Sequence, residues 1–261
     1  MKVDLQQPLG IIAGKGQYPL LLAREARAHG VNPIVAVGFH GDTDEQLANL
    51  VEHFQRVYVG QLNKLIRVFK DHGVRQVIMA GQVTPGRLFK GLRPDWRAIR
   101  MLSRIHPKNA ETVFGELIRE LAKDGLEVLP ATTFLEEHLA AEGVLGKRKP
   151  SRAQLQDIEF GIRIGREVSA LDIGQTVVVK NGVVLAVEAF EGTDAAIRRG
   201  GELGRGDVVV VKLAKSRQDY RFDVPCVGLQ TVESLKNAGA AALAVEAGIT
   251  LFLNKEEVVN E

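Results

Sequence analysis

Short apolar runs alternate with helically spaced apolar positions along the first half of the chain. Residues 9–13 form a run typical of a buried strand, and apolar positions then recur at helical spacing over residues 20–28. Strands that alternate with helices indicate a parallel, doubly wound sheet of the Rossmann-like kind. Further strands are predicted at 33–37, 57–59, 76–80 and 126–129, and further helices at 44–52, 62–71 and 110–123.

The second half of the chain has a different pattern. Residues 177–180 and 183–189 are apolar runs separated by Asn181-Gly182, a pair that strongly favours a hairpin turn. A long helix is expected from 152 to about 170, capped by Ser151 and apolar at Leu155, Ile158, Ile162, Ile164 and Val168. Further apolar runs lie at 207–211 and 249–253, and the expected caps of two more helices are Thr193 or Asp194, and Thr231. We therefore expect a second α/β domain with a mixed sheet.

A glycine-rich, basic stretch at 143–150 separates the two patterns. This composition is typical of a linker between domains. At 261 residues the chain is long enough to form two domains with their own cores. We predict domains at 1–142 and 151–261, joined by a linker at 143–150.

Composition excludes several classes of protein. The net charge is only +2 and aromatic residues make up 5% of the chain, so we expect no nucleic-acid partner. Cys226 is the single cysteine, which excludes an internal disulfide and a cysteine zinc site. No apolar run reaches the ~20 residues of a membrane span, and the N-terminus has no signal-peptide core. We expect a cytoplasmic protein.

The segment 87–108 is the most basic part of the chain. Four apolar residues, Trp96, Ile99, Leu102 and Ile105, recur every three positions within it. A basic amphipathic helix suits a membrane surface, an anionic lipid or a partner helix. A surface helix that packs its apolar stripe on the core has the same pattern, so both interpretations stay open. Beside the single acid Asp95, the segment contains Arg87, Lys90, Arg93, Arg97, Arg100, Arg104 and Lys108.

Two glycine turns follow predicted strands of the first domain. Gly14 and Gly16 begin a G-x-G pattern, but Pro19 stands where a dinucleotide-binding motif has its third glycine. Ligands of doubly wound folds bind along the carboxyl ends of the strands, so both turns can face one nucleotide diphosphate. A tight strand–helix turn without a ligand is the alternative. The candidate binding residues are Ala13, Gly14, Lys15, Gly16, Gly81, Gln82 and Val83.

The segment 212–225 combines four cations with the carboxylates of Asp219 and Asp223. Arginine and lysine bind phosphate oxygens and aspartate binds magnesium, although a salt-bridged surface loop has the same composition. Glu188 and Glu246 lie in two copies of Leu-Ala-Val-Glu-Ala and predict a buried polar pocket. All six histidines precede residue 139, so chemistry in the second domain alone would be metal-assisted. The four cations are Lys212, Lys215, Arg217 and Arg221.

Stretches along nearly the whole chain match one known family. They are Gly10-Ile-Ile-Ala-Gly14 with Pro19, Leu171-Asp-Ile-Gly-Gln175, Leu185–Ala189 with Glu191-Gly-Thr-Asp194, Val211-Lys212, Gln218-Asp219, Arg221, Asp223, Pro225, Thr231-Val-Glu233 and Ala244–Gly248. In these stretches the sequence resembles the LpxI family of UDP-2,3-diacylglucosamine pyrophosphatases in lipid A biosynthesis. The resemblance implies a two-domain enzyme that holds its substrate between the domains. It also implies magnesium-dependent hydrolysis of UDP-2,3-diacylglucosamine to UMP and 2,3-diacylglucosamine 1-phosphate (lipid X), with water attacking the sugar-side phosphorus.

Residue roles follow from the same resemblance. Asp223 matches the family's essential aspartate, and we expect it to act with Asp219, Arg221 and Lys212. The expected Mg²⁺ ligands are Asp223, Asp194 and Glu191, and the glycine turns are expected to hold the nucleotide. We also expect contact with the inner membrane through residues 87–108, and assembly into a homodimer. The remaining expected substrate-binding residues are Glu191, Thr193, Asp194, Lys215, Gln218 and Thr231.

Three other functions stay open. An NAD(P)-dependent oxidoreductase would fit the α/β first half, but the missing third glycine counts against it. A nucleotide-sugar or lipid-binding protein without catalysis would use the same turns and cations. A pyrophosphatase that accepts soluble UDP-sugars would use the same chemistry on another substrate.

Overall fold

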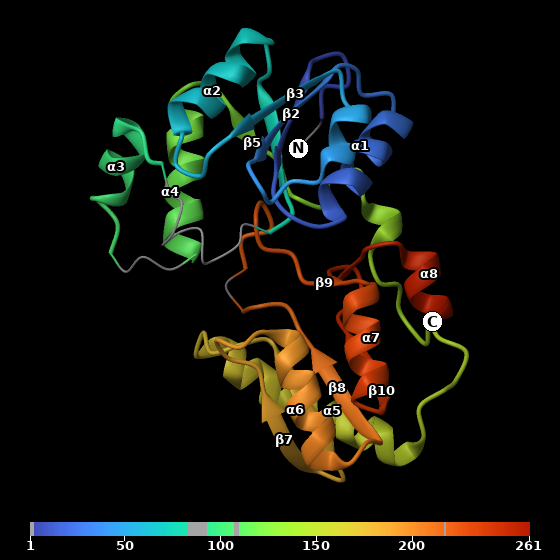
Figure 1. Cartoon of the computed structure of the whole chain (residues 1–261). Coiled ribbons are helices and arrows are strands. Elements are labelled where there is room, and N and C mark those ends of the chain that lie inside the picture. Colours follow the sequence, from blue (N-terminus) through green and yellow to red (C-terminus); the bar gives the residue numbers. More distant parts are fainter. Residues whose placement is uncertain (1–2, 83–92, 107–109, 217) are drawn as a thin grey trace. The chain divides into compact units, whose positions relative to one another are not determined.

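The chain forms two compact units in a computed structural model, which describes residues 3–82, 93–106, 110–216 and 218–261 (Figure 1). The first unit comprises Met1–Leu135 and Asp219–Phe222, and the second comprises Glu136–Gln218 and Asp223–Glu261. Four residues of the second half therefore fold with the first unit. The stretch predicted as a linker, 143–150, lies inside the second unit and has no regular secondary structure.

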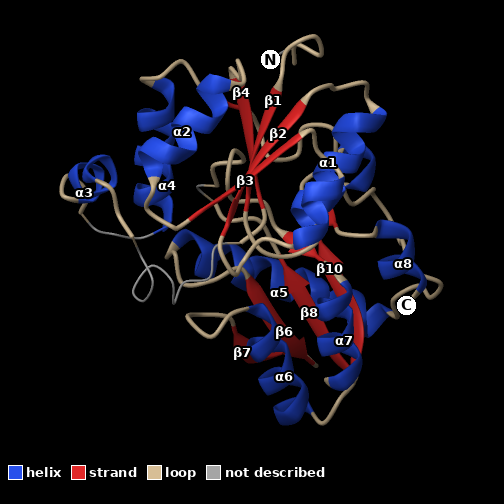
Figure 2. Ribbon diagram, turned by 45° about the horizontal axis from the view of Figure 1, so that its top comes forward, coloured by secondary structure: helices blue, strands red, loops and turns tan. Residues whose placement is uncertain are grey.

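A five-stranded parallel sheet forms the centre of the first unit, with strand order β3-β2-β1-β4-β5 (Figure 2). Its central strand, β1 (Leu9–Ala13), is buried along its whole length, because helices cover both faces of the sheet. The predicted Rossmann-like parallel sheet is confirmed. The other strands are β2 (Ile34–Phe39), β3 (His53–Val57), β4 (Gln76–Ala80) and β5 (Glu127–Val128), and the longer helices are α1 (Tyr18–Ala28), α2 (Leu62–Asp71) and α4 (Ala110–Ala122).

One strand of this sheet lies earlier in the sequence than its apolar pattern predicts. The strand predicted at 57–59 is β3, which begins at His53, and the helix predicted at 44–52 is the short 3-10 helix η1 (Glu45–Asn49). The reason is the position of β3 at the edge of the sheet. Its residues alternate between exposed and half-buried up to Val57, so it has no continuous apolar run.

Helix α3 (Trp96–Leu102) packs beside α2 and α4 at the outside of the first unit (Figure 1). Its buried residues are Ala98 and Met101, whereas Trp96 is 68% exposed and Ile99 is 54% exposed. The interpretation in which the whole apolar stripe packs on the core is therefore wrong. Leu102 and Ile105 do pack against the core, but Trp96 and Ile99 face outward.

The second unit contains a mixed sheet of strand order β10-β8-β6-β7. The hairpin of β6 (Thr176–Lys180) and β7 (Val183–Val187) is antiparallel, whereas β8 (Val208–Lys212) and β10 (Ala240–Val245) are parallel, which confirms the predicted mixed sheet. Helix α5 (Arg152–Ala170) packs on β6 and β8, and α6 (Thr193–Gly204) packs on the other face with α7 (Leu229–Asn237). The remaining elements are η3 (Glu136–His138), β9 (Cys226–Val227), β11 (Leu251–Phe252) and α8 (Lys255–Asn260). No helix of the described residues is long and apolar enough to cross a membrane.

Small residues line the buried face of α5. The buried positions are Asp157, Gly161, Gly165 and Ser169, whereas Leu155 of the predicted apolar stripe is 47% exposed. A Cβ atom on Gly161 would lie 2.6 Å from a methyl group of Val211, so glycine allows the helix to approach the valine-rich sheet. Asp157 also accepts the backbone amides of Asn181 and Gly182 at 2.8 and 2.7 Å, which fixes the hairpin turn to the helix.

Candidate active site

The two predicted glycine turns of the first unit lie side by side. They follow β1 and β4, which are neighbours in the sheet, and Lys15 and Gln82 form an antiparallel bridge. The amide of Lys15 donates to the carbonyl of Gln82 at 2.6 Å, and the reverse bond measures 3.2 Å. The prediction that both turns lie at one edge of the sheet is confirmed. Val83, the last candidate in this set, lies outside the described residues.

Glycine is required in these turns for different structural reasons. A Cβ atom on Gly14 would lie 2.5 Å from the carbonyl oxygen of Gln82, and one on Gly81 would lie 2.6 Å from that of Lys15. Both glycines are therefore needed for contact between the turns. Gly16 has a φ of +95° and no atom within 4 Å of its Cβ position, so a ligand can approach the backbone there.

Ala13 and the start of α1 complete this edge of the first unit. The carbonyl of Ala13 accepts the Thr43 hydroxyl at 2.6 Å, so this oxygen is already engaged. Helix α1 begins after Gln17 without a side-chain cap, and Pro19 occupies its first turn. The residue that replaces the third glycine thus belongs to the helix, where a proline is well tolerated. The open backbone at Gly16 leaves room for an anion to approach the start of α1.

Asp219 and Arg221 form a two-pronged ion pair in the first unit. The guanidinium Nε and Nη2 lie 2.9 and 2.6 Å from the two carboxylate oxygens. The hydrogen bonds from Arg221 lower the pKa of Asp219 although burial would raise it, and the pKa of Arg221 is raised by Asp219. These two predicted catalytic residues therefore neutralise each other, which leaves both less available to a diphosphate or a metal ion.

Aromatic stacking fixes this four-residue segment within the first unit. The ring of Phe222 stacks on Phe114 of α4 with 5.2 Å between the ring centroids. The carbonyl of Tyr220 accepts the amide of Ala131 at 2.8 Å. Phe114 and Ala131 both belong to the first unit, so the segment is held there through Tyr220, between Asp219 and Arg221, and through Phe222, directly after Arg221.

The second unit contains a buried polar cluster centred on Thr193. Its hydroxyl donates to Glu188 Oε1 at 2.9 Å and accepts a 3.2 Å bond from Lys212 Nζ. Glu188 is 8% exposed and Lys212 is 6% exposed, so the cluster brings a buried cation and a buried carboxylate to one hydroxyl group. The other oxygen of Glu188 has no hydrogen-bond partner among the described residues. Glu188 is therefore buried in a polar, hydrogen-bonded environment, as expected for a carboxylate in an apolar stretch.

Glu246, the second glutamate of the repeated sequence, lies in a different environment. Its carboxylate accepts the amide of Ala214 at 2.5 Å, directly after β8. The two glutamates have the same position relative to their strands, since each immediately follows the last residue of β7 or β10. Glu246 thus holds the beginning of the charged segment, whereas Glu188 belongs to the Thr193 cluster.

The expected helix caps of the second unit are wrong in two places. Helix α6 has Gly192 at its N-cap, with a φ of 84°, and Thr193 is already its first residue. The Thr193 hydroxyl is engaged with Glu188 and Lys212 instead of the helix amides. Helix α7 begins after Gly228, so Thr231 is a buried residue of the helix and not its cap.

Asp194 and Glu191 flank the beginning of α6 and have different partners. Asp194 accepts the side-chain amide of Gln230 at 2.9 Å. Glu191 accepts the Arg199 guanidinium at 2.5 Å and the amide of Ala189 at 3.1 Å. Hydrogen bonds from its own backbone, from Arg199 and from Ala189 lower the pKa of Glu191. Both carboxylates are therefore engaged with neighbouring groups.

Asp223 differs from the other candidate carboxylates in its partners. Its side chain lies 3.6 Å from the ammonium of Lys215, and it makes no side-chain hydrogen bond within the part of the chain that the structure describes. Gln218 instead binds the Asp223 backbone carbonyl at 2.6 Å and accepts the amide of Lys215 at 2.8 Å. Gln218 thus fixes the backbone around Asp223. The half-exposed carboxylate of Asp223 stays available.

The pKa of the Cys226 thiol responds to the charges of both Asp223 and Lys212. Burial raises the pKa of the Cys226 thiol to about 11, with Lys212 acting to lower it and Asp223 acting to raise it. Both charges therefore lie near this thiol in the second unit. A thiol with such a raised pKa stays protonated near neutral pH, which excludes it as an activated nucleophile.

The carboxylates fit a magnesium ion that is bound mainly by substrate and water. Magnesium usually takes one or two carboxylates together with phosphate oxygens and water molecules. Among the described residues, no three His, Cys, Asp or Glu side chains are grouped to hold a metal. Asp223, Asp194 and Glu191 are therefore not a preassembled set of three ligands. The unengaged carboxylate of Asp223 fits a single contact of this kind.

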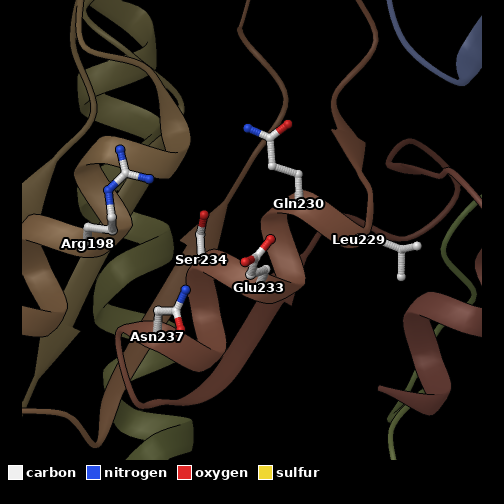
Figure 3. A pocket seen from close by; sticks show the side chains of 6 residues that line it. All are labelled: Arg198, Leu229, Gln230, Glu233, Ser234 and Asn237. Carbon is white, nitrogen blue, oxygen red and sulfur yellow. The ribbon is translucent and has the colours of Figure 1, made fainter.

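A polar pocket of about 530 Å³ lies between α6 and α7 in the second unit (Figure 3). Figure 3 shows Ser234 and Asn237 of α7 on the side that faces Arg198 of α6. Gln230 connects the pocket to the beginning of α6, because it also binds Asp194. Sequence patterns did not indicate this pocket, since its residues come from two helices. Its lining consists of Arg198, Leu229, Gln230, Glu233, Ser234 and Asn237.

Comparison with known proteins gives matches along both halves of the chain. Residues 8–138 match the sequence model of the LpxI N-terminal domain, and residues 141–261 match that of the LpxI C-terminal domain. A protein of Caulobacter vibrioides named UDP-2,3-diacylglucosamine pyrophosphatase LpxI is 32% identical, over 96% of this chain and 92% of the relative. The matched regions include the glycine turns, the Thr193 cluster and the segment around Asp223.

Proposed function

The chain belongs to the LpxI family, and we propose that it hydrolyses the diphosphate of UDP-2,3-diacylglucosamine in lipid A biosynthesis. The products would be UMP and 2,3-diacylglucosamine 1-phosphate. The activity named for the Caulobacter relative supports this substrate. The cations and carboxylates at the ends of β7 and β8 support phosphorus chemistry, because they suit a multiply charged anion.

The availability of Asp223 is the observation that carries this proposal. Asp219 is engaged with Arg221, Glu191 with Arg199, and Asp194 with Gln230. Asp223 has only the 3.6 Å ion pair with Lys215 among the described residues. A carboxylate that positions water or binds a hard cation needs free oxygen lone pairs, and Asp223 has them.

In the proposed mechanism Asp223 orients a water molecule towards the sugar-side phosphorus. The water oxygen forms a bond to this phosphorus, and the bond from the same phosphorus to the bridging oxygen breaks. The bridging oxygen leaves with UMP, and the proton of the water is released. Lys212 and Lys215 stabilise the negative charge of the diphosphate, because each ammonium donates to phosphate oxygens. Thr193 keeps the buried Lys212 ammonium in place.

We also propose magnesium as the cofactor, held by Asp223 with Asp194 or Glu191. When bound, magnesium would neutralise charge on the phosphate oxygens and lower the pKa of a bound water. Asp194 has the simpler route to this role, since its carboxylate accepts a hydrogen bond from the neutral amide of Gln230. Glu191 would first have to leave the Arg199 guanidinium.

The glycine turns of the first unit are the proposed contact for the nucleotide. Gly16 offers open backbone, and the uncapped start of α1 offers amides to a phosphate. The bridge between Lys15 and Gln82 holds the two turns in a fixed relation. A cytoplasmic location at the inner membrane and a homodimer remain our further predictions.

Release of UMP from UDP-2,3-diacylglucosamine tests the proposal. We expect release in Mg²⁺, none with a chelator, and a loss of about 10²–10⁴-fold in Asp223→Asn. The matched control is Glu202→Gln, which removes an exposed carboxylate from the same unit and should keep wild-type turnover. Substrate binding without UMP release at any metal concentration would leave a binding protein. Equal turnover of soluble UDP-sugars would overturn the diacylated substrate.

A further inference from the structure

We propose that the outward face of α3 docks on the surface of a membrane that contains anionic lipid. This contact goes beyond the proposed hydrolysis, because it concerns a different surface of the first unit. Residues 96, 99, 100 and 103 lie on one face of the helix, since they are separated by three, four and seven positions. That face presents Trp96, Ile99, Arg100 and Ser103, and it is opposite to the buried Ala98 and Met101.

The two large apolar side chains of this face are mostly exposed. Trp96 is 68% exposed and Ile99 is 54% exposed, and they are neighbours along the helix. A single exposed apolar residue needs no explanation, but adjacent large ones within a basic segment indicate an interaction surface. Trp is a preferred residue at membrane interfaces, because its ring is apolar and its N–H is polar.

The charges around this face are not neutralised. Arg100 and Arg104 are exposed and form no ion pair within the described part of the chain. The guanidinium of Arg100 lies 5.5 Å from the centroid of the Trp96 ring, which places a cation directly beside the apolar contact. Asp95 is the nearby acid, and its two oxygens accept the amides of Ala98 and Asn63. The surface is therefore positive and complements an anionic partner.

The other arginine of α3 has a structural role that keeps the surface in place. Arg97 binds Glu120 at 2.9 Å and Asp124 at 2.6 Å, and it is only 20% exposed. These bonds fix α3 to α4, while Asp95 caps the beginning of α3. Trp96 and Ile99 are therefore presented by a fixed helix, and docking requires no folding of α3.

An anionic bilayer fits this combination better than a soluble acidic partner. Apolar side chains gain from insertion between lipid headgroups, and arginine side chains can bind lipid phosphates while their stems cover apolar surface. Each basic residue near an anionic membrane strengthens binding about five-fold. A diacylated substrate, as in the proposed function, would also be presented by a membrane.

Vesicles without any substrate provide the test, so its result does not depend on hydrolysis. We expect the wild-type protein to sediment with phosphatidylethanolamine–phosphatidylglycerol vesicles at low salt and to remain free with phosphatidylcholine vesicles. Trp96 is the single tryptophan of the chain, so a blue shift of its emission would report insertion of this face. Failure to sediment with anionic vesicles, or sedimentation without an emission shift, would overturn the proposal.

Two variants and two controls locate the contact. Charge reversal in Arg100→Glu with Arg104→Glu should weaken vesicle binding at least about 25-fold, and Ile99→Glu should abolish the emission shift. The controls are Arg24→Glu on α1 and Leu203→Glu on α6, which change an exposed cation and a 62% exposed apolar residue. Equal loss in the controls, or wild-type binding by the variants, would overturn the assignment. Equally tight binding to heparin without an emission shift would assign the surface to a soluble polyanion.

Discussion

Lys212 at the end of β8 donates a 3.2 Å hydrogen bond to the hydroxyl of Thr193 at the beginning of α6. The same hydroxyl donates to Glu188 at 2.9 Å, so one small side chain joins a buried cation to a buried carboxylate. Thr193 is five residues from Glu188 and 19 residues from Lys212. Strand β6 lies between β7 and β8 and brings the ends of these two strands to one edge of the sheet. The cluster is therefore a product of the mixed sheet.

Replacement of Thr193 by valine should separate these partners. Valine has a similar shape but no hydroxyl, so Glu188 and Lys212 would both lose a buried hydrogen bond. We expect the free energy of unfolding to fall by about 1–3 kcal/mol and UMP release to decrease through misplacement of Lys212. Urea denaturation and steady-state kinetics measure the two effects. Thr193→Ser should retain both properties, and a fully active, equally stable valine variant would contradict the role of the hydroxyl.

The Cys226 thiol can report the charges around the proposed catalytic residue. Its pKa of about 11 predicts slow alkylation at pH 8, because burial disfavours the thiolate. Asp223→Asn should lower this pKa and accelerate alkylation, since Asp223 raises it, whereas Lys212→Met should slow the reaction. The pH dependence of iodoacetamide labelling, followed by mass spectrometry, measures both shifts. Labelling at the rate of an unhindered thiol would show that Cys226 is not buried as described.

Arg97 should make the stability of the first unit sensitive to acid. A hydrogen bond from Lys123 and another from Arg97 lower the pKa of Glu120 against burial, and burial of Asp124 is likewise outweighed by bonds from Arg97 and Lys70. Lowered carboxylate pKa values stabilise the folded state above the unfolded values of ~4. This stabilisation is lost as the pH falls through the folded values.

The corresponding variant is Arg97→Met. We expect it to lower the free energy of unfolding by about 2 kcal/mol at pH 7 and to flatten the decrease between pH 5 and pH 3, as measured by urea denaturation across that range. Arg100→Met is the matched control, because Arg100 belongs to the same helix but has no ion pair among the described residues. A control that loses as much stability as Arg97→Met would refute the proposed anchor between α3 and α4.

Two glycines in helices should respond oppositely to alanine. At Gly161 the new Cβ would lie 2.6 Å from a Val211 methyl group, so we expect Gly161→Ala to destabilise the second unit by about 1–3 kcal/mol. At Gly115 of α4 no atom lies within 4 Å of the Cβ position, so Gly115→Ala should stabilise the first unit by about 0.5–1 kcal/mol. Thermal unfolding of both variants measures the difference in sign. Similar effects at both positions would argue against close packing of α5.

Local patterns predicted the sheets and the two glycine turns successfully. The run 9–13 becomes β1 with the same limits, and Asn181-Gly182 forms the hairpin turn with φ values of 50° and 74°. Such features depend on neighbours along the chain. The contact between Lys15 and Gln82 could also be predicted, because it follows from two parallel strands that end at the same edge of the sheet.

Other features depend on partners that are distant in sequence. The spacing of Trp96, Ile99, Leu102 and Ile105 indicates a shared helix face, but it does not tell which part of that face meets the core. The position of α3 is set by Arg97 and its acids on α4. Similarly, Thr193 has the composition of a helix cap, but Glu188 and Lys212 engage its hydroxyl. Arg97 and Thr193 thus both depend on a partner that lies outside their own helix, 23 residues away at Glu120 and 19 residues away at Lys212.

Residues Asp219–Phe222 fold with the first unit although they lie within the second half of the chain, which limits how the gene can be divided. The polypeptide passes from one unit to the other three times, after residues 135, 218 and 222. A fragment that stops at residue 142 would therefore lack Phe222, and the ring of Phe114 would lose its stacking partner. Cutting the chain at one position therefore cannot give two complete folding units. The protein is best expressed, exchanged or fused as the whole chain.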